Sequence, residues 1–277
     1  MDDLQEVLFA AGVQHFSPSQ LNRPTANWVF EYVHLTKDQR RSITVGENAA
    51  YGTAVHGGIQ SILCTGEDVD TAIDHALMEF DFHPANENAD KREHYRTLIE
   101  PAIELGVEEL VPWQGSVEEE RVEWHPEGLA VPIMGFVDMF QPEKNRFLEM
   151  KTKAPRQGAV KKDGTRGWVK AMTPKQPEWS HIQQCAVYHK ATGLEPNIAY
   201  ISDHTVTLFT PENCDKLSSE AIEFAAKQML NKALKRQNLL KISTDPKVLA
   251  SILEADFDHP FYWKHQFVEE AKELFGC

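Results

Sequence analysis

Apolar residues recur at helical spacing through the first 110 residues of the chain. Small and apolar side chains three or four positions apart predict a helix over residues 47–63. The same spacing predicts helices over 69–80 and 91–110, and Pro101 is expected to interrupt the second. The first part of the chain is therefore predicted to be helical.

The pattern then changes to that of strands. Alternating or continuous apolar runs predict strands over 117–124, 129–140 and 146–152. Turn-forming residues at 126–128 and 142–145 separate these runs, as the loops of a meander would.

Further along, a helix over 178–192 ends at a glycine, and a strand pair follows over 197–202 and 205–209. The rest is predicted to be helical, over 214–240, 246–254 and 261–275. The order of elements is helices, a meander, a helix, a hairpin and more helices. This order predicts an α/β protein with a central mixed β-sheet flanked by helices.

Composition narrows the class of protein. The chain has 277 residues, 42% hydrophobic and 25% charged, which is ordinary for a globular protein. No apolar run approaches the roughly 18 residues of a membrane span, and the acidic start lacks a signal pattern, so a cytoplasmic protein without a membrane partner is expected. The four cysteines are far apart, which argues against a disulfide framework or a metal cluster.

The net charge of −14 is unusual for a protein that binds nucleic acid, but the charge is unevenly distributed. Residues 151–175 contain eight basic residues and one acid. A solvated, flexible loop is one interpretation of this basic segment; substrate contact is the other, favoured because the segment follows directly after two charged strand residues. The expected contacts are Lys153, Arg156, Lys161 and Lys162.

Those charged residues lie within apolar strands. Asp138 interrupts one run, and Glu149 and Lys151 share one face of the next, because strand side chains alternate between faces. Such charges are costly to bury unless a partner compensates. A divalent cation would, since Mg²⁺ and Mn²⁺ prefer hard oxygen ligands. The alternative is a structural salt bridge between Glu149 and Lys151, since an acid-x-lysine triplet also occurs at Asp245/Lys247 and Glu270/Lys272.

The chain resembles the RecB-like branch of the PD-(D/E)xK nuclease superfamily. Four motifs carry the resemblance, in the family's order: Gly52-Thr-Ala-Val-His56, Gly135-Phe-Val-Asp138, Glu149-Met-Lys151-Thr152 and Gln184-Cys-Ala-Val-Tyr188. The segment Ser17-Pro-Ser19-Gln-Leu21 also looks like the opening helix of this branch. The resemblance covers about residues 15–210 and implies a restriction-endonuclease-like core in a single domain 1–277, with a helical C-terminal extension over about 211–277.

The resemblance also implies roles for individual residues. His56, Asp138, Glu149 and the backbone carbonyl of Met150 would bind Mg²⁺ or Mn²⁺. Lys151 would complete the catalytic site with Asp138 and Glu149, and Gln184 and Tyr188 would support it and contact DNA. The cysteines that flank the core in iron–sulfur members have no counterpart here, so no cluster is expected.

The function implied is hydrolysis of DNA phosphodiester bonds, and proteins of this size in the branch are often exonucleases in recombination, repair or phage-type DNA processing. DNA with free ends is the expected partner, with possible recombination or repair proteins. Three alternatives remain: an endonuclease using the same site, a non-catalytic nucleic-acid-binding protein with this fold, and a metal-dependent hydrolase of another substrate.

Overall fold

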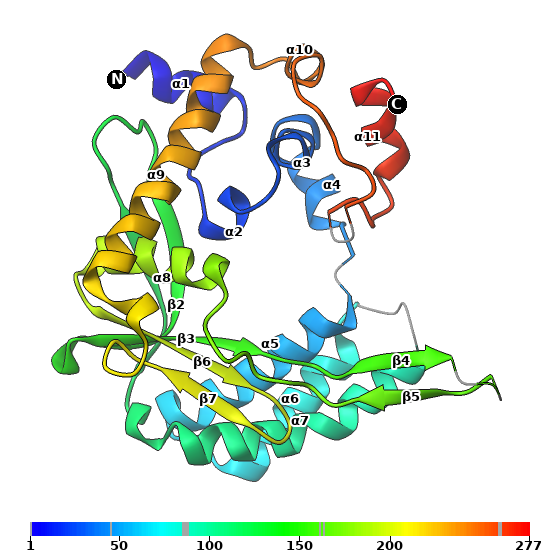
Figure 1. The fold of residues 1–277 in the computed structure, drawn as a ribbon, viewed down its shortest axis with the longest axis vertical. Helices are drawn as coiled ribbons and strands as arrows, with labels where there is room; N and C mark the ends of the chain where they lie inside the picture. Colours follow the sequence, from blue (N-terminus) through cyan, green and yellow to red (C-terminus); the bar gives the residue numbers. More distant parts are fainter. Residues whose placement is uncertain (1, 45, 85–88, 161, 163, 260–261) are drawn as a thin grey trace.

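A mixed sheet of five strands lies at the centre of the computed structural model, which describes residues 2–44, 46–84, 89–160, 162, 164–259 and 262–277 (Figure 1). The strand order is β1-β2-β3-β6-β7, and only β3 and β6 pair in parallel. The strands are β1 (Val117–Trp124), β2 (Ile133–Gln141), β3 (Arg146–Thr152), β6 (Glu195–Ile201) and β7 (Val206–Phe209). The predicted α/β class with a mixed sheet is confirmed.

Helices cover both faces of this sheet, because its inner strands are apolar on both sides. Ile198 and Tyr200 of β6 pack in one buried cluster, and the alternate residues Ala199 and Ile201 pack in another. The first cluster includes α8 (Trp179–Thr192) and α9 (Ser219–Ile242). The second includes α5 (Glu47–Gln60), α6 (Val69–Phe82) and α7 (Ala89–Glu109), as Figure 1 shows.

The helices α5 and α7 fit together through two glycines. A Cβ atom added at Gly58 would lie 2.4 Å from Cδ1 of Ile103, and one added at Gly106 would lie 2.4 Å from Cδ1 of Ile59. Each helix therefore inserts an isoleucine into the space left by a glycine of the other. The predicted interruption at Pro101 is wrong: α7 continues through it, because the loss of one backbone hydrogen bond is offset by burial of neighbours such as Ile103.

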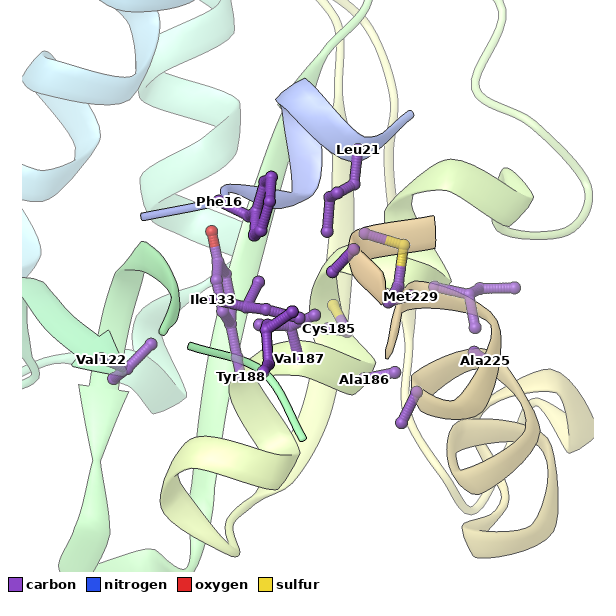
Figure 2. Close-up of a cluster of buried hydrophobic side chains, with 14 of the residues drawn as sticks. Phe16, Leu21, Val122, Ile133, Cys185, Ala186, Val187, Tyr188, Ala225 and Met229 are labelled. Atoms are coloured by element: carbon purple, nitrogen blue, oxygen red, sulfur yellow. The ribbon is translucent and has the colours of Figure 1, made fainter. Parts of the chain in front are cut away.

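The C-terminal region is part of the core and not an appendage to it. Met229 and Ala225 of α9 pack on Cys185 of α8 together with Phe16 and Ile133 (Figure 2). Two further helices, α10 (Pro246–Ala250) and α11 (Val268–Phe275), complete the chain, and their segment packs against Phe30 in a third cluster. The helix predicted over 261–275 begins only at Val268, and residue 261 lies outside the described residues.

The N-terminal region is more divided than the pattern predicts. The segment that resembles an opening helix begins with Ser17 as its N-cap, whose hydroxyl accepts a hydrogen bond from the backbone N–H of Gln20 at 3.3 Å. The remaining helical segments are α1 (Asp2–Ala10), α2 (Pro18–Leu21), α3 (Thr25–Val29), a π-helical turn (Phe30–His34) and α4 (Lys37–Arg41). A second π-helical turn, Ser61–Thr65, extends α5. Short 3-10 turns occur at Val111–Trp113, Pro142–Lys144 and Asp215–Leu217.

The described part of the basic segment contains regular secondary structure rather than only a loop. Its residues form an antiparallel hairpin of β4 (Arg156–Val160) and β5 (Arg166–Val169), which projects beyond the main sheet (Figure 1). Trp168 of β5 anchors it, because its ring stacks on that of His94 with centroids 3.9 Å apart. Within the described part of the chain, no helix combines the length and apolar character that crossing a bilayer requires.

Candidate metal centre

Asp138 lies where the two central strands β2 and β3 separate. Their backbone pairing runs from Gln141 opposite Arg146 to Met139 opposite Leu148 and stops there. At the next position, Oδ2 of Asp138 accepts a hydrogen bond from the backbone N–H of Met150 at 2.6 Å. Because the N–H and C=O of one strand residue point to the same edge, the Met150 carbonyl also points into this gap.

Glu149, on the same strand, is almost fully buried at 2% exposure. Its Oε1 accepts hydrogen bonds from Nζ of Lys151 and, at 2.6 Å, from Nε2 of Gln184. Its Oε2 is buried and has no hydrogen-bond partner. One carboxylate oxygen is therefore satisfied and the other is left available.

The charges of this cluster influence one another. Burial raises the pKa of Glu149 to about 8; the charge of Asp138 adds to the shift, and Lys151 and Gln184 partly offset it. Burial acts to lower the pKa of Lys151, but the nearby Glu149 and Asp138 raise it above its usual value. Lys151 therefore stays an ammonium, and its ion pair with Glu149 favours the carboxylate form against the cost of burial.

His56, from α5, also has an unsatisfied polar atom. Its Nε2 is buried without a hydrogen-bond partner. Burial lowers its pKa, and the charge of Lys151 lowers it further, against the opposing effect of Asp138. The imidazole is therefore neutral, which is the form that binds metals.

Two of the sequence motifs meet at Gly135. A Cβ atom added there would lie 2.4 Å from Cε1 of Tyr188, so the glycine makes room for the tyrosine ring. The hydroxyl of Tyr188 then accepts a hydrogen bond from Nε2 of Gln184 at 2.8 Å, and the same Nε2 donates to Glu149. Gly135 and Tyr188 thus hold the amide that orients a candidate metal ligand.

The sequence interpretation missed residues that position the others. Gln60 follows His56 by one helical turn, and its Nε2 donates to the backbone carbonyl of Asp138 at 2.8 Å. That four-residue spacing was a usable signal. His181 was also missed: its Nδ1 lies 2.7 Å from the hydroxyl of Tyr200, a contact between α8 and β6 that spacing along the chain does not indicate.

The predicted site residues divide into two sets. The structure brings together His56, Asp138, Glu149, Met150, Lys151, Gln184 and Tyr188. Lys153 forms an ion pair with Glu178, and Arg156 and Lys162 are exposed on the hairpin. Lys161 lies outside the described residues.

The atoms available at the candidate centre fit a hard divalent cation. They are an imidazole nitrogen, two carboxylates and a backbone carbonyl, and two of them, on His56 and Glu149, are buried and unpartnered. Among the described residues, no three His, Cys, Asp or Glu side chains already stand together as a metal site. At this centre Oε1 of Glu149 is paired with Lys151, and Oε2 has no hydrogen-bond partner.

Comparison of the chain with models of known protein families, with curated proteins and with solved structures finds no match in any of the three.

Proposed function

We propose that this protein is a metal-dependent deoxyribonuclease with a restriction-endonuclease-like core. The observation that carries the proposal is the pair of buried, unpartnered atoms, Nε2 of His56 and Oε2 of Glu149, in a cluster that also contains Asp138 and Lys151. Unsatisfied buried polar atoms are costly, so their presence at one place indicates a ligand that completes them.

His56, Asp138, Glu149 and the Met150 carbonyl would hold Mg²⁺ or Mn²⁺. Such an ion lowers the pKa of bound water and stabilises charge on a phosphate under attack. Lys151 supplies a second positive charge beside the attacked phosphate, because its pKa keeps the ammonium protonated. Gln184 fixes the rotamer of Glu149.

The finer assignment is an exonuclease of DNA recombination, repair or phage-type DNA processing, acting in the cytoplasm. It rests on the resemblance of the four ordered motifs to the RecB-like branch of the PD-(D/E)xK superfamily. The partner would be DNA with free ends. The hairpin residues Arg156 and Lys162 would contact its phosphates, which offsets the repulsion expected from a net charge of −14.

The test is degradation of end-labelled linear DNA beside a closed circle, with Mg²⁺, Mn²⁺ or EDTA. The wild type is compared with Lys151→Ala and with Lys247→Ala. Lys247 belongs to a second acid-x-lysine triplet, but it is exposed and lies at the start of α10, so it is a matched control.

We expect the wild type to degrade only the linear DNA, and only with a metal. Lys151→Ala should abolish this degradation, and Lys247→Ala should leave it unchanged. Cutting of the circle would instead establish an endonuclease. If no DNA is cut with either metal, or if Lys151→Ala cuts as the wild type does, the proposal is wrong.

One observation favours a second candidate, a non-catalytic DNA-binding protein. Lys151 forms an ion pair with Glu149 and so neutralises the carboxylate that a metal would need. A protein of this kind would bind DNA in EDTA and in Mg²⁺ with equal affinity, and Mn²⁺ would not raise its unfolding temperature.

A further inference from the structure

A second site lies between α9 and the segment after α2, away from the residues of the candidate metal centre. A cavity of about 450 Å³ opens between the segment after α2 and the middle of α9. The side chains that matter for its chemistry are Asn22, Arg23, Lys232, Lys235, Arg236 and Tyr262. Four of these six carry a positive charge, and none of the described residues that line the cavity is Asp or Glu.

Arg236 forms the floor of this cavity and is only 3% exposed. Its guanidinium donates to the backbone carbonyls of Gln20 at 2.6 Å and Arg23 at 2.7 Å, and it stacks over the ring of Trp28 at 4.9 Å. Those partners are all neutral. A buried guanidinium without a carboxylate is uncommon, because desolvation of a charge usually requires an opposite charge.

Lys232, one turn before Arg236 on the same helix, is in a similar state. Its Nζ donates to Oδ1 of Asn22 at 2.6 Å and to Oε1 of Gln183 at 3.0 Å, which leaves one of its three N–H donors. Lys235 is exposed beside it. Neither lysine forms an ion pair with a described carboxylate.

The fourth cation is already paired. Arg23 bonds the buried carboxylate of Glu31 at 2.6 Å, so this pair contributes little net charge. Among the described residues, Lys232, Lys235 and Arg236 have no ion-pair partner, in a protein whose net charge is −14. Burial and the neighbouring Arg236 lower the pKa of Lys232, and burial lowers the pKa of Arg236 to about 9, as expected where an anion is missing.

The cavity and the candidate metal centre are connected through adjacent residues of α8. Gln183 bonds Lys232 on the α9 side, and the next residue, Gln184, bonds Glu149 on the sheet side. Asn22 also reaches α8, where its Nδ2 donates to the backbone carbonyl of Ser180 at 3.3 Å. A single polymer bound along the first turns of α8 could contact both the cavity and the candidate metal centre.

We infer that this cavity binds a phosphate group of the DNA strand on which the metal centre acts, an inference that rests on the proposed nuclease function. A phosphate presents several acceptor oxygens and a negative charge. The cavity offers the third N–H of Lys232 and the exposed ammonium of Lys235, with the charge of Arg236 beside them. The strand would thus be held at two points, which adjacent residues of α8, Gln183 and Gln184, link.

The test is binding of a fluorescent single-stranded oligonucleotide in EDTA, where it is not cut, over a series of salt concentrations. Lys232→Gln, Lys235→Gln and the double variant are compared with Lys227→Gln, which removes an exposed lysine of the same helix outside the cavity. Lys235→Gln changes an exposed side chain, so its effect does not depend on folding. Inorganic phosphate is tested separately, by its effect on the unfolding temperature.

The double variant should bind roughly tenfold more weakly, and each lysine removed should reduce the slope of log affinity against log salt by about 1. Lys227→Gln should bind as the wild type does. Oligonucleotides with a 5′-phosphate, a 3′-phosphate or neither then distinguish a terminal phosphate from an internal one, and both would support the inference.

Two outcomes would overturn it. The first is wild-type DNA binding by the double variant. In the second, inorganic phosphate raises the unfolding temperature of the wild type but not of the double variant, while the two proteins bind DNA equally. The cavity would then be a site for free phosphate. If the wild type binds DNA through these lysines but never cuts it, the nuclease proposal fails and the binding site stands.

Discussion

The carboxylate of Asp138 accepts a hydrogen bond from the backbone N–H of Met150 at 2.6 Å. This bond links β2 and β3 just beyond the point where their backbone pairing ends, at Met139 opposite Leu148. Asp138 therefore has two roles that substitutions can separate. It completes the sheet as a hydrogen-bond acceptor, and it contributes negative charge to the candidate metal centre.

Asp138→Asn keeps an acceptor oxygen for Met150 but removes the charge. We expect its free energy of unfolding to stay within about 1 kcal/mol of the wild type, while cleavage falls more than about 100-fold, since even outer-shell partners of metal ligands contribute 10- to 100-fold. Asp138→Ala should in addition lose about 1–3 kcal/mol, because the Met150 N–H loses its partner. Urea unfolding and the cleavage assay measure both effects. Equal activity of Asp138→Asn and wild type would contradict the assignment.

His56→Leu should raise the stability of the metal-free protein while it abolishes cleavage. The substitution removes a buried, unpartnered nitrogen from the metal-free protein and fills its space with an apolar side chain. We expect the unfolding free energy in EDTA to rise by about 1 kcal/mol, and cleavage with Mg²⁺ to be lost. Mn²⁺ should raise the unfolding temperature of the wild type but not of the variant. A variant that is less stable and still active would exclude His56 as a ligand.

The two motif glycines should respond differently to alanine. At Gly135 the added Cβ would lie 2.4 Å from the ring of Tyr188, so Gly135→Ala should cost about 1–3 kcal/mol and displace the Gln184 amide. At Gly52 the nearest atoms, on Thr152, are 3.8 Å away, so Gly52→Ala should be tolerated and raise helix stability by up to about 1 kcal/mol. Thermal unfolding of the two variants measures this difference. Equal losses of stability in both variants would contradict the prediction.

His181 should make stability fall in mild acid. Burial, together with the charge of Lys151, lowers its pKa to about 4, below the ordinary value of 6.5. Because the folded-state pKa is depressed, its contribution is complete above pH 6.5 and is lost as the pH falls through 4, by up to about 3 kcal/mol. We expect the difference in unfolding free energy between wild type and His181→Gln to shrink from pH 7 to pH 4. A difference that does not change with pH would show that His181 is not the titrating group.

Periodicity predicted the central strands because each contains an alternating or continuous run of apolar residues. The β3 strand, for example, is buried from Phe147 to Met150, and a short turn joins it to β2. The site motifs were found for a related reason. Charged residues such as Asp138 and Glu149 stand out within apolar runs, and local spacing fixes the face on which they lie.

Long-range packing explains what the sequence did not indicate. The hairpin of β4 and β5 carries many charges and too few apolar residues to show a strand pattern, and it is anchored by Trp168 against His94 of a distant helix. The role of Gly135 is also invisible locally, because the ring that needs its space belongs to Tyr188, more than fifty positions later. The continuation of α7 through Pro101 likewise depends on contacts with another helix.

The paired insertion of Ile103 at Gly58 and of Ile59 at Gly106 has a mechanical consequence. Two reciprocal notches, one on each helix, oppose sliding of α5 along α7, because each isoleucine would then leave the space that its glycine provides. His56 and Gln60, carried on α5, therefore have a fixed height above the sheet. If the proposed ion binds, we expect the adjustment to come from rotation of side chains such as Glu149 rather than from movement of the helix.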